Sequence, residues 1–441
     1  MAEMYQPTLV IGLGGTGKKI ILALKKMIAE NSEHGLSDFP FLKMISMDTD
    51  KAIPPATSSI KTIKDDSLTL NPNKELFQLQ AGFGTVPDFD DYPEIKEWFP
   101  DSLKSMLMPA ELAKGAGQKK PVGRFTFAWN ASDIYEELNS FIKAPVDAIV
   151  AKQKGIADKL SNTINVFICG SICGGTGAGT FLDTAYLVRY LSHINSNGFQ
   201  VKIFGLFALA SMFDDFQGTS NVRQNCYASL VELDHFMNPI NYNNPYRTFY
   251  PAYKNWKPDY STSSKYRPFD YPFLFDNFGK KVSLNSSSFT DMAARFIYLL
   301  TGHELSDHWF SMDSNVEATM EQTYKRDIYN KAIKYRSMGT FSILYPKRMI
   351  VQLCAYNLSK DYLNKILDDS YAPQEIENLA KRFLRDLKLD PTTDQLENAF
   401  DIFNEPDGFT GSFTDYIKLQ ISDIVLPKVN LDFFRKAYKV D

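Results

Sequence analysis

Cysteine and histidine are scarce in this chain. Its 441 residues include 4 cysteines and 5 histidines. The cysteines form no CxxC pair and do not suggest the disulfide framework of a small secreted domain. The histidines show no HExxH or HxxxH spacing, which argues against a zinc site. We therefore expect a reduced, cytoplasmic environment.

An excess of positive charge and long apolar runs are also lacking. The formal net charge of -4 offers no basic surface for nucleic acid. The longest apolar stretch, residues 201–213, is too short to cross a bilayer, and the N-terminus shows no signal-peptide pattern. We expect neither a nucleic-acid partner nor a membrane span. The apolar fraction of 44% instead indicates a globular protein, and the length allows two domains.

Glycine, by contrast, is concentrated in one segment after a short apolar run, Val166–Ile168. Four of the six residues from 174 to 179 are glycine, and a helical pattern follows from Phe181. Such a segment has almost no side chains to bury, but its backbone amides can approach an anion at a helix N-terminus. The pattern predicts a phosphate-binding turn between a strand and a helix. The alternative is a strand-to-helix turn that binds nothing.

A second glycine-rich segment, residues 12–17, follows a β-rich run at Thr8–Ile11 and precedes a helical pattern at Ile20–Ile28. It fits the dinucleotide fingerprint Gly-x-Gly-x-x-Gly. It also nearly fits a P-loop, in which Lys19 replaces the magnesium-binding Ser or Thr. By itself the segment does not decide between these motifs.

Acidic residues follow the next predicted strand, Phe41–Met47. Asp48 and Asp50 flank Thr49 at its end, and open α/β sheets bind ligands at the carboxyl ends of their strands. We therefore interpret this tripeptide as part of a binding site, with an acidic surface turn as the alternative.

A basic segment, Lys114–Arg124, carries further glycines. Lys119, Lys120 and Arg124 could close over anionic oxygens. A basic loop that is merely exposed to solvent is the alternative.

The order of these segments resembles the tubulin/FtsZ superfamily of GTP-binding cytoskeletal proteins. Gly174–Thr180 resembles the glycine signature of that superfamily, and residues 12–17 resemble its first phosphate loop. Asp48-Thr49-Asp50 is similar to the Asn-Thr-Asp of FtsZ, and Lys114–Arg124 is similar to the Gly-Ala-Gly loop that faces the γ-phosphate. The resemblance covers residues 8–320 and indicates a divergent bacterial tubulin-like protein.

The resemblance implies a site for GTP or GDP, with Mg²⁺ near Asp48 or Asp50. Asn277 falls where tubulin reads guanine, and an amide suits both a donor and an acceptor on the base. Asp214 or Gln217 would contact the ribose. The implied nucleotide-binding residues are Gly12, Gly14, Gly15, Thr16, Gly17, Asp48, Thr49, Asp50, Gly115, Ala116, Gly117, Gly174, Gly175, Thr176, Gly177, Ala178, Gly179, Thr180, Asp214, Gln217 and Asn277.

In this superfamily subunits stack head to tail into filaments, and an acidic loop of the neighbour completes the GTPase site. The corresponding segment is Ser311–Glu317, where Asp313 falls on the first acid and Val316 replaces the second. Glu317 lies one residue after the position of that second acid, so its carboxylate would not point where the acid of the superfamily points. We therefore expect only weak hydrolysis, with Asp313 and Glu317 as the candidate catalytic residues. Two alternatives stay open: a nucleotide-gated scaffold without turnover, and a Rossmann NAD(P)-dependent oxidoreductase.

We expect an α/β fold whose Rossmann-like parallel sheet forms a GTP-binding domain of tubulin/FtsZ type over residues 1–288. Residues 237–271 are longer than a usual connection, and we interpret them as an insertion that could bind another protein. Residues 289–310 would form the central helix, and residues 311–441 a smaller, helix-rich second domain. The sequence leaves open whether the native chain extends past residue 441.

Overall fold

The chain divides into two compact units, Met1–Phe341 and Ser342–Asp441. The domain boundaries expected at residues 288 and 310 stay predictions. The structure, a computed structural model, describes residues 6–32, 35–50, 70–71, 74–79, 86, 88–112, 115–150, 163–195, 200–214, 221–237, 267–277, 285–301, 309, 335–339, 347–367, 374, 377–378 and 381–382.

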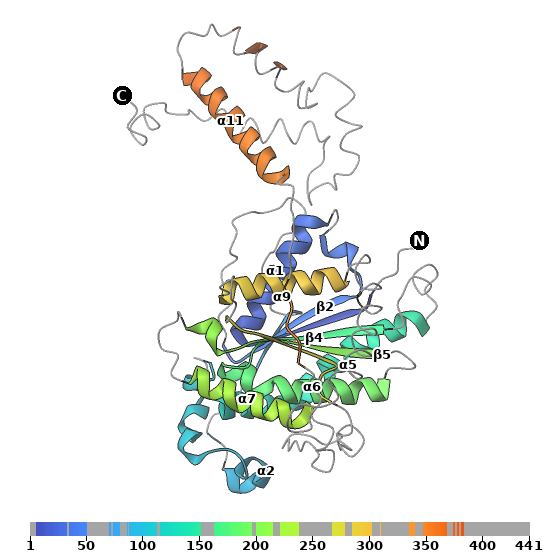
Figure 1. The fold of residues 1–441 in the computed structure, drawn as a ribbon, viewed down its shortest axis with the longest axis vertical. Helices are drawn as coiled ribbons and strands as arrows, with labels where there is room; N and C mark the ends of the chain where they lie inside the picture. Colours follow the sequence, from blue (N-terminus) through green and yellow to red (C-terminus); the bar gives the residue numbers. More distant parts are fainter. Residues whose placement is uncertain are drawn as a thin grey trace, which may run out of the picture. The chain divides into compact units, whose positions relative to one another are not determined.

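A parallel sheet forms the centre of the first unit, and its described strands follow the order β3-β2-β1-β4-β5-β6. Every neighbouring pair is parallel, which confirms the predicted α/β fold. Strands β2 and β3 follow one another on one side of β1, and β4, β5 and β6 follow on the other side (Figure 1). The strands are β1 (Thr8–Leu13), β2 (Leu42–Asp48), β3 (Leu76–Gln78), β4 (Thr163–Ser171), β5 (Gln200–Ala208) and β6 (Tyr271–Phe275).

Helices cover both faces of this sheet. Helices α1 and α9 pack on one face, and α5, α6 and α7 lie on the other, where α4 packs against α6 (Figure 1). The helices are α1 (Gly14–Asn31), α4 (Lys120–Trp129), α5 (Ala131–Val150), α6 (Gly175–Asn195), α7 (Val222–Met237) and α9 (Ser286–Thr301). Shorter elements are η1 (Gly35–Asp38), η2 (Phe89–Asp91), α2 (Pro93–Lys96), η3 (Asp101–Leu107), α3 (Pro109–Leu112) and η5 (Ala210–Phe213).

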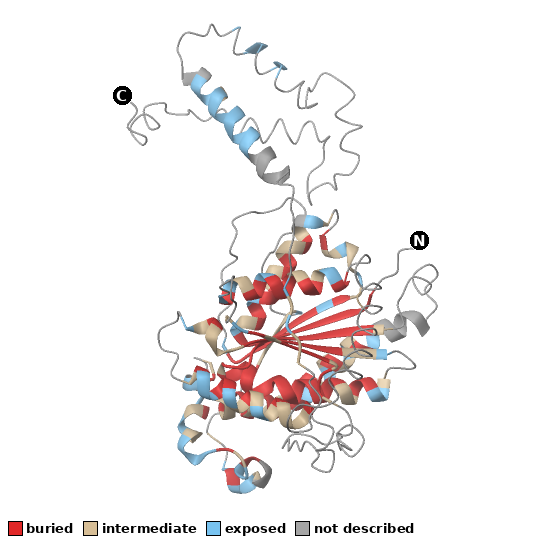
Figure 2. Cartoon of the chain, viewed as in Figure 1, coloured by how far each residue is buried: buried red, intermediate tan, exposed pale blue. Residues whose placement is uncertain are grey.

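Burial on both faces explains the continuous apolar runs of the strands. All six residues of β1 are buried, as expected for a parallel sheet with helices on both sides, and Figure 2 shows the central strands in the buried colour. On the α9 face, the ring of Phe204 stacks between Phe167 at 4.6 Å and Tyr271 at 4.7 Å. On the opposite face, Phe181 of α6 meets Phe207 at 5.5 Å.

A third apolar cluster supports helix α4. Phe89, Phe99 and Phe125 are buried together there, and the rings of Phe89 and Phe99 meet edge to face at 5.4 Å. For residues 52–113 the sequence predicts irregular segments with short helices, and most of the described part agrees. Strand β3 is the exception. The cluster anchors the chain just before the segment at residues 115–119.

At both glycine-rich segments the helix begins earlier in the chain than the sequence predicts. Helix α1 begins at Gly14 and α6 at Gly175, so most of these glycines belong to the first turns of helices. The hydrophobic periodicity that locates a helix is carried by side chains. Glycine contributes none, and the predicted helices therefore began too late.

The central helix and the insertion are only partly described. Helix α9 spans Ser286–Thr301, which overlaps the central helix expected at 289–310. The insertion expected at 237–271 lies between α7 and β6, and its residues 238–266 are outside the described part.

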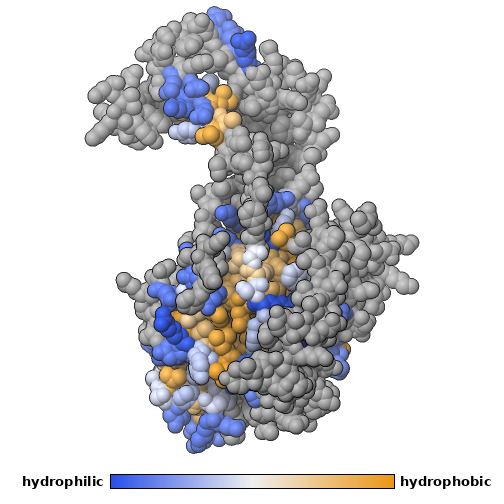
Figure 3. Space-filling view, in the orientation of Figure 1, coloured by the Kyte–Doolittle hydropathy of each residue, from blue (hydrophilic) through white to orange (hydrophobic). Residues whose placement is uncertain are grey.

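The second unit is described mainly through α11 (Lys347–Leu367), in line with the helix-rich second domain that was expected. The coloured, described part of this unit shows both hydrophilic and hydrophobic side chains (Figure 3). Among the side chains of α11 that the structure describes, the large exposed apolar ones are Leu353, Tyr356, Leu358 and Leu363. Across the described residues, no helix combines the length and apolarity needed to cross a bilayer.

Candidate functional site

Two helix N-termini meet where the strand order reverses. β1 and β4 are neighbours, and α1 and α6 start at their carboxyl ends. A Cβ built on Gly14 would lie 3.4 Å from Thr176 Cβ and 3.7 Å from the nitrogen of Gly177. The first turns of the two helices are therefore side by side. Open α/β sheets bind their ligands at such a switch point.

The ends of these helices suit an anion. The first amides of an α-helix have no partner within the helix, and the helix dipole is positive there. Neither helix carries an acidic residue in its first turn, and no side chain caps the N-terminus of α1. The two turns therefore present backbone donors to the same place.

A third segment, residues 115–118, lies across the start of α6. Gly115, Gly117 and Gln118 all have positive φ, at 91°, 52° and 55°, a conformation that glycine adopts without strain. A Cβ built on Gly175 would lie 2.7 Å from Ala116 Cβ, and one on Gly115 would lie 3.6 Å from Asp50 Cβ. The structure thus brings together the glycine segments and the acidic tripeptide that the sequence singled out.

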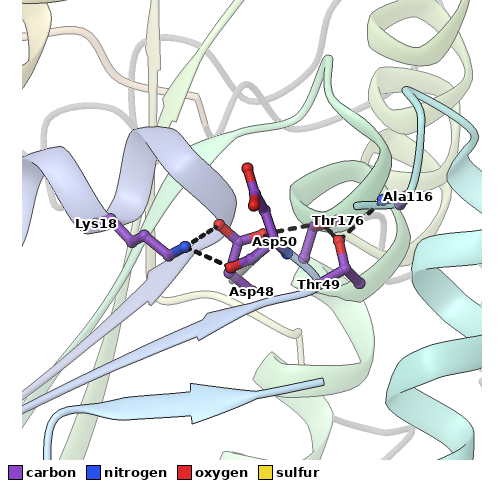
Figure 4. A network of polar contacts seen from close by, with 6 residues as sticks. All are labelled: Lys18, Asp48, Thr49, Asp50, Ala116 and Thr176. Carbon is purple, nitrogen blue, oxygen red and sulfur yellow. Dashed lines mark hydrogen bonds and ion pairs between the residues drawn. The ribbon is translucent and has the colours of Figure 1, made fainter. Parts of the chain in front are cut away.

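Hydrogen bonds join these segments into one network (Figure 4). The amide of Ala116 donates to Thr49 Oγ1 at 3.0 Å, and Thr49 Oγ1 lies 2.8 Å from Thr176 Oγ1. Thr176 Oγ1 also donates to Asp48 Oδ1 at 3.3 Å. Through this chain of bonds, the end of β2 holds both the 115–118 segment and the first turn of α6.

Lys18 completes the network, and the sequence analysis gave it no role. Its ammonium lies 2.9 Å from Asp48 Oδ2 and donates to the carbonyl oxygen of Asp50 at 2.7 Å. The only sequence signal was the P-loop-like pair Gly17-Lys18. Asp50 itself is exposed.

The glycines of the two turns differ in the space available around a side chain at their positions. A Cβ built on Gly15 or Gly174 would meet nothing within 4 Å. In contrast, a Cβ on Gly177 would lie 2.2 Å from the carbonyl oxygen of Ser171, and one on Gly179 would lie 2.5 Å from the nitrogen of Arg124. The second group serves close backbone packing, which the sequence analysis did not foresee.

Two of the basic side chains expected to close over an anion are engaged elsewhere. Lys120 Nζ lies 2.5 Å from Glu232 Oε2 on α7, and burial lowers the pKa of Lys120 despite that carboxylate. Arg124 Nε lies 3.4 Å from Asp183 Oδ2, and its guanidinium stacks over Trp98 at 4.8 Å. Helices α6 and α7 supply the partners of Lys120 and Arg124, and contact of these two side chains with an anion stays a prediction.

Of the residues expected at the base and ribose, Asn277 and Asp214 are described, and both follow the carboxyl ends of strands in the sheet. Asn277 follows β6, and its backbone amide donates to Ser211 Oγ at 3.0 Å. Asp214 follows η5 and pairs with Arg223 of α7 at 3.1 Å. Gln217, Asp313 and Glu317 lie outside the described residues. Among the residues that are described, no three His, Cys, Asp or Glu side chains form a metal-binding group.

Asn225 of α7 is a further positioning residue that no sequence signal identified. Its Nδ2 donates to the carbonyl oxygens of Gln118 at 2.8 Å and Cys173 at 3.0 Å, so it ties the 115–118 segment to the turn before α6.

Cys173 and Cys226 are buried in one cluster. A hydrogen bond from the Cys173 thiol lowers the pKa of Cys226, whereas burial raises the pKa of Cys169.

The fold and site define a doubly wound α/β protein with its site at the switch point. A family model described as "Tubulin like" matches residues 9–364. The chain belongs to this tubulin-like family, which confirms the resemblance found in the sequence. The alternative of a dinucleotide-dependent oxidoreductase is therefore not retained.

Several solved structures are similar to this chain at low identity, whereas the comparison with curated proteins found no match. The GTPγS-bound protofilament of CetZ2 from Haloferax volcanii is 14% identical, with a TM-score of 0.33, over 67% of this chain and 58% of that one. An FtsZ mutant from M. jannaschii is 16% identical, with a TM-score of 0.28, over 67% and 54%. TubZ from Bacillus thuringiensis serovar israelensis, in a GTPγS-form protofilament, is 14% identical, with a TM-score of 0.30, over 68% and 56%. The chain spans little more than half the length of these structures.

Proposed function

We propose that this protein binds a guanine nucleotide, with its phosphates at the first turns of α1 and α6. The observation that carries the proposal is the meeting of these two turns, where the positions beside Gly15 and Gly174 are open. Backbone amides and two helix dipoles give such a place a preference for phosphate. Membership of the tubulin-like family supports the same assignment.

The base would lie toward Asn277, and the ribose toward Asp214 or Gln217. Because the strands are parallel, the ends of β5 and β6 lie on the same edge of the sheet as the two glycine turns. The side-chain amide of Asn277 can pair with both a donor and an acceptor of guanine. Equal affinity for ATP and GTP in a competition titration would contradict this assignment.

Magnesium fits one of the two proposed carboxylates better than the other. Mg²⁺ prefers octahedral oxygen ligands and retains several waters. Asp50 is exposed, whereas the side chain of Asp48 is 4% exposed and bound to Lys18. We therefore keep Asp50, and not Asp48, as the proposed ligand of a nucleotide-bound Mg²⁺.

We further propose head-to-tail self-association, with slow GTP hydrolysis completed by Asp313 or Glu317 of the adjacent subunit. The support is the sequence of Ser311–Glu317 and family membership. Positioned charge would stabilise the transition state. Hydrolysis that rises with protein concentration and falls in Asp313→Ala would support the proposal. Turnover that is unchanged in this variant would contradict it.

The nucleotide site is tested by filling its open positions. In Gly15→Val and Gly174→Val the new side chain meets no protein atom at its Cβ, so folding is retained while approach of phosphate is blocked. We expect affinity for labelled GTP to fall at least about tenfold, or roughly 1.4 kcal/mol.

Gly339→Val is the matched control, because a Cβ there also meets nothing within 4 Å and the position lies outside the proposed site. It should bind GTP like the unaltered chain. If both site variants melt normally and bind GTP with unchanged affinity, the phosphates are not held at these turns.

A further inference from the structure

A buried ion pair lies beside the two glycine turns. The side chains of Lys18 and Asp48 are 1% and 4% exposed, and the ammonium lies 2.9 Å from Asp48 Oδ2 (Figure 4). Buried ions are tolerated when their remaining hydrogen-bonding capacity is also used. Here Lys18 donates to the carbonyl oxygen of Asp50, and Asp48 Oδ1 accepts from the amide of Asp50 at 3.2 Å and from Thr176 at 3.3 Å.

The carboxylate of this pair is close to both helix N-termini. A Cβ built on Gly14, the first residue of α1, would lie 4.0 Å from Asp48 Oδ1. Thr176, which donates to the same oxygen, is the second residue of α6. A carboxylate without a counter-ion at this place would repel an incoming phosphate, since the buried side chain of Asp48 is screened little by solvent.

A divalent cation does not fit at Asp48. One carboxylate oxygen already contacts an ammonium, and the other already accepts two hydrogen bonds. A metal ion bound to Asp48 would have to displace Lys18, and it would leave that ammonium buried without its carboxylate. Such an uncompensated charge is strongly unfavourable.

We infer that Lys18 is the permanent counter-ion of Asp48, which makes the base of the phosphate site electrically neutral, and that Asp48 is not a ligand of magnesium. The inference rests on the proposed nucleotide binding. Lys18 is then a positioning residue that acts through Asp48 and Thr176. Any divalent cation that accompanies the nucleotide is held by other groups.

The test compares Lys18→Met, Asp48→Asn and the double variant Lys18→Met/Asp48→Asn. Affinity for labelled GTP is measured with Mg²⁺ and with EDTA for each chain. We expect Lys18→Met to bind GTP at least about tenfold more weakly because Asp48 loses its counter-ion, and Asp48→Asn not to show this loss. The double variant should recover most of the affinity. The ratio of the affinities in Mg²⁺ and EDTA should be the same in the double variant as in the unaltered chain.

Removal of one partner from a buried pair can prevent folding, whereas removal of both is often tolerated. The double variant therefore decides the matter even if Lys18→Met is insoluble. Lys25→Met/Glu75→Gln is the matched control, because it removes another ion pair of α1, at 2.7 Å with side chains 5% and 14% exposed. It should leave both the affinity and the Mg²⁺-to-EDTA ratio unchanged.

Two results would overturn the inference. A large Mg²⁺-to-EDTA ratio that falls to one in the double variant would show that Asp48 holds the metal. A folded double variant that binds GTP about tenfold or more weakly than the unaltered chain would show that charge compensation is not the role of Lys18. If the unaltered chain binds no GTP in either buffer, the proposed function fails, and this inference fails with it.

Discussion

The same tetrapeptide, Gly-Gly-Thr-Gly, lies at the N-terminus of both helices of the candidate site, as residues 14–17 and 174–177. Its first glycine is the first residue of α1 but immediately precedes α6. Its last glycine has one role in both copies. A Cβ built on Gly17 would lie 2.3 Å from the carbonyl carbon of Gly12, and one on Gly177 would lie 2.2 Å from the carbonyl oxygen of Ser171. In each case only glycine lets the helix start so close to the end of its own strand.

The second glycine differs between the copies. Gly15 is exposed and has open space around it, whereas Gly175 is buried, with its Cβ position 2.7 Å from Ala116 Cβ and 2.9 Å from the nitrogen of Lys119. The cause lies outside the tetrapeptide, since residues 115–119 lie over the start of α6 and not over that of α1. The second glycine of the tetrapeptide therefore has room for a side chain in the α1 copy but not in the α6 copy, although the local sequence is identical.

The largest expected effect tests the role that the copies share. Gly17→Ala and Gly177→Ala both place a Cβ against backbone that cannot move cheaply, and we expect each to lose about 3 kcal/mol of unfolding free energy or more. Urea denaturation measures the loss. Gly174→Ala is the control for Gly177→Ala, because its Cβ meets nothing within 4 Å. Unfolding midpoints within error of each other for these two variants would contradict the packing role.

A smaller effect should separate the copies. Gly175→Ala must push aside Ala116 and the backbone of Lys119, and we expect a loss of about 1–3 kcal/mol. Gly15→Ala lies in the first turn of α1 without a clash, so it should be neutral or stabilising by up to about 1 kcal/mol. Thermal melting of both variants gives the comparison. Equal shifts in Tm would mean that the 115–119 segment does not press on α6.

The smallest expected effect concerns the threonines of the two copies. Thr176→Val removes the hydroxyl that links Thr49 and Asp48, and leaving those buried groups short of a partner should cost about 1–2 kcal/mol. Thr16→Val is the matched change at a half-buried position and should stay within about 0.5 kcal/mol. Chemical denaturation distinguishes the two. If Thr16→Val is the more destabilised, the network of Figure 4 contributes little to stability.

The sequence by itself determined the alternation of strands and helices, apart from the short strand β3, and the parallel sheet, and it placed the candidate site at the carboxyl edge of that sheet. These features follow from local patterns: apolar runs mark buried strands, and glycine-rich turns connect them to helices. Three segments of the candidate site, residues 12–17, 48–50 and 174–179, were located for the same reason, because each lies at or directly after the end of a strand. The starts of α1 and α6 were missed, since glycine has no side chain to carry a helical pattern.

Only the tertiary structure decided which of those residues meet. Thr49 and Thr176 are separated by 127 positions in the chain, and they form a hydrogen bond only because the ends of β2 and β4 lie on either side of β1. The pairing of Lys18 with Asp48 and the engagement of Lys120 by Glu232 depend on the same packing of distant elements. The chemical type of a side chain limits what it can bind, but the tertiary fold decides which partner lies beside it.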